Sequence, residues 1–210
     1  MEEISSTKKV DEKKAAKAAA RFEAERKVRE EKELKEAALV AEKKKFAAAQ
    51  NLAAEIYSTG KKGAELLEYI KSTPEKPSGA NFVFEILSHL KSPFESATAA
   101  VKWCTKSEYG ETLSYLLDGK PRDQMAAVYV VQKFCHDLNF PKIDFKDQKK
   151  NLIEFFFQIM YQNEIIDQGG FAAWADDDSD DVAPGKQNAV IQTSSFMALI
   201  NEEDAEEYDD

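Results

Sequence analysis

The feature that most constrains the fold is an N-terminal stretch that contains neither Gly nor Pro. Residues 8–57 consist mainly of Ala, Glu, Lys and Arg, the residue types with high helix propensity. Pairs such as Glu23–Lys27 and Glu31–Lys35 place a carboxylate four residues before a cation on one helix face. The larger apolar residues are spaced too irregularly for a coiled-coil seam. The pattern favours one long, solvated, charged helix within residues 1–57, with a coiled coil and a charged linker as alternatives.

The remainder of the chain, residues 58–210, predicts an all-α body. Short apolar-periodic segments alternate with turn signals, and no polar/apolar alternation is long enough to indicate a strand. One helix start is marked by Ser92 as a cap, Pro93 at the first helical position and Glu95 completing a capping box. The expected helices are 62–72, 80–91, 93–106, 110–117, 122–138, 146–161, 164–175 and 186–201.

The apolar residues indicate how these helices pack. Residues 152–161 are apolar on nearly every side, so this helix should lie at the centre of the body and be covered on more than one face. Cys135 belongs to an apolar stripe with Val128 and Val131, which predicts a buried thiol rather than a reactive one. Short connections favour antiparallel neighbours, so the predicted architecture is a small α-solenoid of HEAT-like helical hairpins.

Few residues of the chain are suited to catalysis or metal binding. The two cysteines, Cys104 and Cys135, and the two histidines, His89 and His136, lack metal-ligand spacing. The sequence also has no Gly-rich phosphate loop. We therefore expect no metal, no cofactor and no catalytic residue. No apolar run is long enough for a transmembrane helix or a signal peptide, so the expected location is cytoplasmic.

The negative charge of the chain is concentrated at its C-terminal end. The formal net charge is −10, but residues 167–210 contain 13 acidic residues and a single basic one, Lys186. Residues 1–50 carry 14 basic and 11 acidic residues, and residues 51–166 carry 14 and 15. An acidic end repels nucleic acid, whose phosphates require Lys and Arg. The expected partner of this end is a basic protein segment, not a nucleic acid or a membrane.

Two segments within this acidic region combine aromatic residues with carboxylates. Phe171 and Trp174 are three residues apart, Phe196 and Ile200 are four apart, and each pair precedes an acidic run. Such spacing places each pair on one helix face. One interpretation is that the aromatics only anchor the last two helices and the acids form a solvating tail. The other is that both segments form a binding surface.

The order of these motifs resembles the C-terminal HEAT-like domain with two acidic/aromatic boxes in eukaryotic translation initiation factors four gamma, five and two B epsilon, with the four gamma branch the most similar. One position departs from the pattern, because the second tryptophan of the family falls on Leu199. The matching segments are Phe155-Phe156-Phe157, Glu164-Ile165-Ile166, Phe171-x-x-Trp174, the acidic loop 176–181, Phe196-x-x-Leu199-Ile200 and the acidic tail 202–207.

The resemblance implies an adaptor that binds Lys/Arg-rich segments through an acidic/aromatic face. The implied partners are other initiation factors, such as the beta subunit of factor two, or a kinase. Phe171, Phe196 and Ile200 are expected as structural anchors. The expected protein-binding residues are Glu164, Trp174, Asp176, Asp177, Asp178, Asp180, Asp181, Leu199, Glu202, Glu203, Asp204, Glu206, Glu207 and Tyr208. We expect the acidic loop and the acidic tail to form one continuous acidic face.

Two other functions are compatible with the sequence. The charged helix could bridge complexes or associate with the ribosome. By analogy with two B epsilon, the domain could also promote guanine-nucleotide exchange on initiation factor two, although the segments that precede the domain in that branch are absent from this sequence.

Overall fold

In this computed structural model the described residues are 23, 26, 27, 29, 31, 32, 34–38, 40, 41, 44, 45, 47–146, 148–179 and 184–207, with side chains described up to Glu202. Residues 1–22 of the predicted charged helix lie outside this set. So do Asp180, Asp181 and Tyr208, and the side chains of Glu203, Asp204, Glu206 and Glu207.

The chain divides into two units, Met1–Ala48 and Ala49–Asp210. Every described residue between 23 and 48 is helical and exposed, as the composition predicts. The expected pair between Lys35 and Glu31 is present, with 2.8 Å between Nζ and Oε1. The compact second unit begins before residue 58, where the sequence placed the boundary, because Ala53 and Ile56 are buried in its core.

The second unit begins with helical residues 49–58 and continues with a series of short helices and one pair of strands. The elements are α2 (Gly63–Ser72), α3 (Gly79–Ser88), α4 (Ala97–Val101), the 3-10 helix η1 (Lys102–Cys104), α5 (Gly110–Leu117), α6 (Pro121–Asp137), β1 (Lys142–Phe145), β2 (Gln148–Asn151), α7 (Leu152–Gln162), α8 (Gln168–Asp176) and α9 (Lys186–Glu207).

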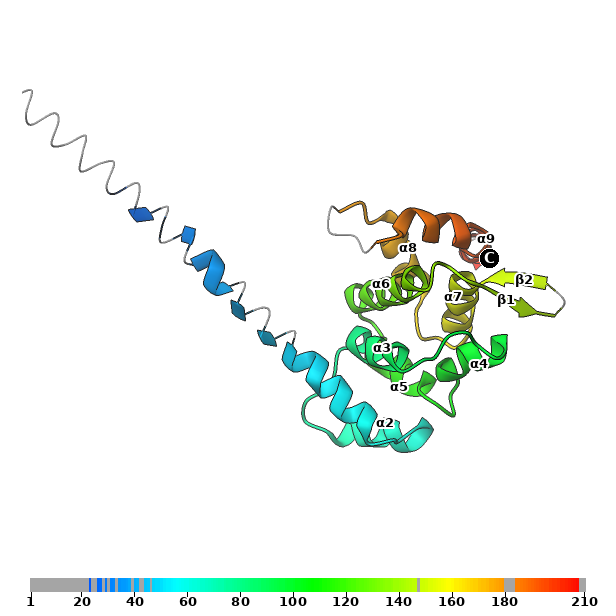
Figure 1. Cartoon of the computed structure of the whole chain (residues 1–210), viewed down its shortest axis with the longest axis horizontal. Coiled ribbons are helices and arrows are strands. Elements are labelled where there is room, and N and C mark those ends of the chain that lie inside the picture. The colour runs from blue at the N-terminus through cyan, green and yellow to red at the C-terminus, as the bar shows by residue number, and fades with distance from the viewer. Residues whose placement is uncertain are drawn as a thin grey trace, which may run out of the picture. The chain divides into compact units, whose positions relative to one another are not determined.

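The helices are stacked one upon another (Figure 1). α2 packs on α5, α5 on α3 and α3 on α6, while α6 also contacts α7 and α8, and α7 contacts α9. Each helix therefore contacts mainly its neighbours in the stack, as in helical-repeat proteins. The all-α fold class is confirmed. Helix α7 is buried at Leu152, Ile153, Phe155, Phe156, Phe157 and Met160, as expected for a central helix.

A small antiparallel hairpin corrects the expectation of a helix over residues 146–161. β1 pairs with β2 in the register Ile143 to Lys150, and α7 begins only at Leu152. The alternation Lys142-Ile143-Asp144-Phe145 is too short to be distinguished in the sequence. The hairpin places Phe145 against the core, with its ring centroid 5.0 Å from that of Phe155.

Two predicted helix starts are also wrong. Ser96, not Ser92, caps α4, since its Oγ accepts a hydrogen bond from the Ala99 amide at 3.1 Å. Asp167 caps α8, and its Oδ1 accepts from the Gly170 amide at 2.8 Å. Glu164, the predicted first residue of that helix, has φ of 56° and lies in the preceding turn. In both cases several polar residues could cap, and packing selects the later one.

The two cysteines lie in the core, as the sequence predicted for Cys135. Cys104 and Cys135 are free and buried, and burial raises the pKa of both thiols. Among the described residues, no helix has the length and apolarity that crossing a bilayer requires. The same part of the chain contains no His, Cys, Asp and Glu cluster suited to a metal ion.

Candidate protein-binding site

The C-terminal motifs converge on one aromatic cluster beneath the last two helices. Phe157 of α7 lies at its centre, with ring centroids 5.0 Å from Phe171, 5.1 Å from Trp174 and 6.1 Å from Phe196. Phe171 and Phe196 are 5.0 Å apart and nearly perpendicular. Edge-to-face contacts of this kind add to the stability gained from burial. The three predicted anchors Phe171, Phe196 and Ile200 are all buried.

Trp174 is a core residue. Its side chain has no exposed surface, and its indole Nε1–H donates to Gln132 Oε1 at 2.8 Å. Gln132 also donates from Nε2 to the carbonyl of Pro184 at 3.1 Å. The side-chain amide of Gln132 thus links Trp174 to Pro184, in the segment that leads into α9. A fully covered ring offers no surface to a partner, so we assign Trp174 the role of an anchor, not a contact.

Lys186, the single basic residue of the acidic region, covers the outer side of this tryptophan. Its Nζ lies 4.3 Å from the Trp174 ring centroid and also donates to the Trp174 carbonyl oxygen. Burial lowers the pKa of Lys186, while the carboxylates of Asp177 and Asp176 oppose that shift. The cation therefore connects the start of α9 to the end of α8.

Asp177, the second residue of the acidic loop, is held in place by two hydrogen bonds. The Tyr129 hydroxyl donates to Asp177 Oδ2 at 2.8 Å, and the Ser179 amide donates to Oδ1 at 3.1 Å. The hydrogen bond from Ser179, and then the one from Tyr129, lower the pKa of Asp177. Burial and the bonded carboxylate raise the pKa of Tyr129. Asp177 is thus ionised and oriented, and its neighbours Asp176 and Asp178 are exposed.

Gly185, just before α9, is required by its surroundings. Its φ is +83°, and a Cβ at this position would lie 2.6 Å from His136 Cδ2. Any other residue would be both strained and crowded. This turn directs the chain from the acidic loop back along the body.

The described carboxylates of the acidic loop, at residues 176–178, and Glu202 of the acidic tail lie at opposite ends of the α8/α9 hairpin. This arrangement corrects the expectation of one continuous acidic face. At one end Lys186 bonds Trp174, and at the other Gln168 Nε2 donates to Asn201 Oδ1 at 3.3 Å. The two helices are therefore antiparallel. At 1.5 Å per residue, Lys186 and Glu202 are about 24 Å apart along α9. Charges so far apart are screened from one another at physiological salt.

The end of the hairpin near Gln168 carries its own carboxylates. Asp118, Glu164 and Asp167 line a shallow cavity of about 550 Å³ together with Ser114, Gln124, Tyr161 and Ile166. The Glu164 side chain is exposed. Asp167 is used structurally, because its Oδ2 accepts from Gln124 Nε2 at 2.9 Å. We call Asp176, Asp177 and Asp178 the loop cluster, and Asp118, Glu164, Asp167 and Glu202 the distal cluster.

Leu199 occupies the position of the second family tryptophan and is half exposed, whereas its neighbour Ile200 is fully buried. Leu199 therefore does not act as an anchor. It is part of the outer surface of α9, together with Ile191, which is 67% exposed.

Sequence reasoning missed Tyr129 and Gln132 and gave Lys186 no role of its own. A polar residue beside Val131 in an otherwise apolar stripe was the available signal for Gln132. A single cation within an acidic region was the corresponding signal for Lys186. Neither signal specifies the tryptophan that both residues contact.

Residues 123–210 match the protein family described as "W2: eIF4-gamma/eIF5/eIF2-epsilon". This segment forms a W2 domain. The resemblance seen in the sequence is thereby confirmed. The matched segment contains most of α6, the β1/β2 hairpin and helices α7 to α9. The match supports a protein-interaction role of the kind found in initiation factors.

Curated relatives agree with this assignment. The chain is 31% identical over 84 residues to eukaryotic translation initiation factor 4 gamma 2 from Homo sapiens, and equally to that of Bos taurus. The corresponding protein of Mus musculus is 30% identical over the same length. Each alignment covers 40% of this chain but only 8% of the relative. The similarity is therefore to one domain of much longer proteins.

Proposed function

We propose that the W2 domain of this chain is an adaptor that binds Lys/Arg-rich segments of other proteins through the carboxylates at the ends of its α8/α9 hairpin. The observation that carries the proposal is the combination of the family match over residues 123–210 with 13 acidic residues against one basic residue in 167–210. Clustered carboxylates attract and select basic partners.

The arrangement of the site supports binding without a large rearrangement. The aromatic cluster fixes the positions of α8 and α9, and Lys186 Nζ is held by the ring and the carbonyl oxygen of Trp174. The exposed loop cluster can therefore meet a cation directly. Since exposed charge pairs are individually weak, the affinity must come from several carboxylates acting on one basic segment.

The separation of the two clusters defines the kind of partner. A basic segment that contacts both the loop cluster and Glu202 has to extend over about 24 Å, the length of α9 between them. Two shorter basic segments could instead occupy the two ends independently. By family resemblance the partners are other initiation factors, such as the beta subunit of factor two, or a kinase. The proposed role is a cytoplasmic one.

A peptide-binding measurement tests the proposal. A fluorescent peptide with a run of lysines should bind the full chain, and its Kd should rise steeply with salt concentration. Replacing Asp176, Asp177 and Asp178 by Asn, and Glu164 and Glu202 by Gln, should weaken binding at least tenfold. A matched variant with five exposed carboxylates changed elsewhere, at Glu55, Glu65, Glu68, Glu75 and Glu95 to Gln, controls for net charge. Equal binding by the two variants would contradict the proposal.

A further inference from the structure

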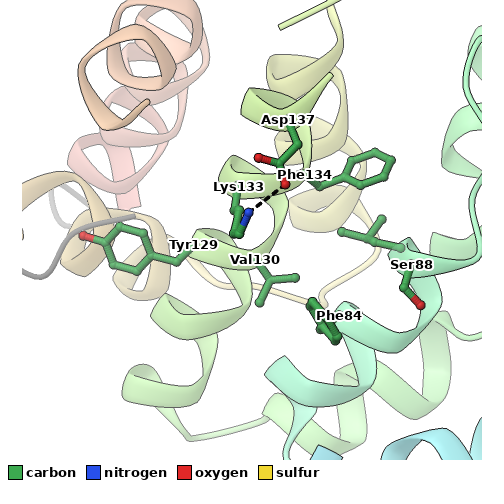
Figure 2. Close-up of a pocket in the computed structure, with 8 residues that line it drawn as sticks. Phe84, Ser88, Tyr129, Val130, Lys133, Phe134 and Asp137 are labelled. Atoms are coloured by element: carbon green, nitrogen blue, oxygen red, sulfur yellow. Dashed lines mark hydrogen bonds and ion pairs between the residues drawn. The ribbon is translucent and has the colours of Figure 1, made fainter. Parts of the chain in front are cut away.

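An apolar groove lies between α3 and α6, close to the loop cluster (Figure 2). Its cavity volume is about 330 Å³, within the range of pockets that accept apolar ligand groups. Phe84, on its α3 side, is 42% exposed, although phenylalanine is usually buried. The groove is lined by Phe84, Leu87, Ser88, Tyr129, Val130, Lys133, Phe134 and Asp137.

Within the groove the charged side chains are already paired. Lys133 Nζ lies 2.7 Å from Asp137 Oδ2, and this hydrogen bond, followed by that from His136, lowers the pKa of Asp137. The remaining wall is apolar, formed by Phe84, Val130 and Phe134 (Figure 2). A bulky apolar side chain would therefore enter the groove without leaving a buried charge unpaired.

Tyr129 connects this groove to the acidic loop. Tyr129 is one of the residues that line the groove, and its hydroxyl donates to Asp177 Oδ2 at 2.8 Å. The exposed carboxylates of Asp176 and Asp178 flank that aspartate in the sequence. An apolar cavity is thus followed directly by a cluster of negative charge. A ligand that fits both must carry apolar side chains beside cations.

We propose that the α3/α6 groove binds the apolar part of a partner segment whose neighbouring Lys and Arg residues contact the loop cluster. This inference rests on the proposed function and adds the chemistry of the partner: bulky apolar side chains adjoining a basic run. Apolar anchors carry most of the binding energy at such interfaces, while charges select and orient the partner.

Three synthetic peptides test the inference by fluorescence anisotropy with the full chain. The first is a lysine run alone, the second joins the same run to an amphipathic segment with Leu and Phe anchors, and the third has those anchors replaced by Ala. The anchored peptide should bind about tenfold more tightly than the other two. That gain should persist at high salt, because apolar contacts are not screened.

Phe84→Ser should remove most of the gain while leaving the affinity of the lysine run unchanged. Tyr115→Ser is the matched control, since Tyr115 is an aromatic residue of similar exposure, 38%, on α5. If the anchored peptide gains nothing over the lysine run, or if Phe84→Ser leaves the gain intact, the groove proposal is wrong and the proposed function stands. If no lysine peptide binds the parent chain, the proposed function itself fails.

Photo-crosslinking identifies the occupant directly. With p-benzoylphenylalanine in place of Ser88, which is exposed and lines the groove, the anchored peptide should be captured in preference to its Ala version. Capture of residues 1–48 of the same chain, or of a second copy, in place of the peptide would overturn the inference.

Discussion

Trp174 and Leu199 occupy the two positions at which the family pattern places tryptophan, yet their surroundings differ completely. Trp174 is fully buried and its Nε1–H is satisfied by Gln132, whereas Leu199 is half exposed. We predict that Trp174→Ala lowers the free energy of unfolding by about 3–5 kcal/mol, the usual cost of truncating a buried aromatic residue. Leu199→Ala should change it by less than about 1 kcal/mol. Urea denaturation followed by circular dichroism measures both values, and equal losses would contradict the assignment.

The loop cluster permits a second prediction for a single residue. Because the Asp177 pKa is lowered in the folded state, the Ser179 and Tyr129 bonds contribute stability above the ordinary carboxyl pKa. That contribution is lost as pH falls through the lowered value. A carboxyl-detected NMR titration should give Asp177 a pKa below that of an unstructured aspartate, and Tyr129→Phe should raise it part of the way back. An unchanged pKa in Tyr129→Phe would show that the hydrogen bond is not formed in solution.

At the level of elements, the antiparallel α8/α9 hairpin separates the two acidic clusters. We predict that neutralising Asp176, Asp177 and Asp178 affects stability and peptide affinity independently of neutralising Glu164 and Glu202. The free-energy changes of the combined variant should equal the sum of the two separate changes within about 0.5 kcal/mol, as for distant sites. A strongly non-additive result for stability, from denaturation of the four proteins, would mean that the clusters are in contact.

The differences between sequence and structure also occur at this level. The helical character of α2, α3 and α6 follows from apolar periodicity, so these elements were predicted close to their observed bounds. The β1/β2 hairpin was missed, because four alternating residues resemble any short polar segment. More than one polar residue precedes α4 and α8 and could cap them, and only tertiary packing selects among these residues.

The composition of the candidate site could be predicted, but its arrangement could not. The acidic runs and the anchors Phe171 and Phe196 are evident in the sequence. The Trp174–Gln132 bond joins residues 42 positions apart, and nothing local specifies it. The separation of the acidic clusters likewise depends on α9 returning antiparallel to α8, which charge patterns do not encode.

For the whole molecule, the start of the compact unit at Ala49 makes a further prediction. Removing residues 1–48 should leave the melting temperature of the remainder nearly unchanged, since every described residue of 23–48 is exposed. Removing residues 1–58 should lower it clearly, because Ala53 and Ile56 are then lost from the core. Differential scanning calorimetry of the two truncated proteins and the full chain provides the comparison. Equal melting temperatures for both truncations would place the boundary at residue 58.

The central claim is that carboxylates at the ends of the α8/α9 hairpin receive a basic segment. The most direct measurement is an NMR titration of the isotope-labelled full chain with the lysine peptide, following each backbone amide. We predict that the largest shifts occur at residues 176–179 and around Glu164 and Glu202, and that they disappear at high salt. Shifts confined to α2 and α5, or an absence of shifts at low salt, would contradict the claim.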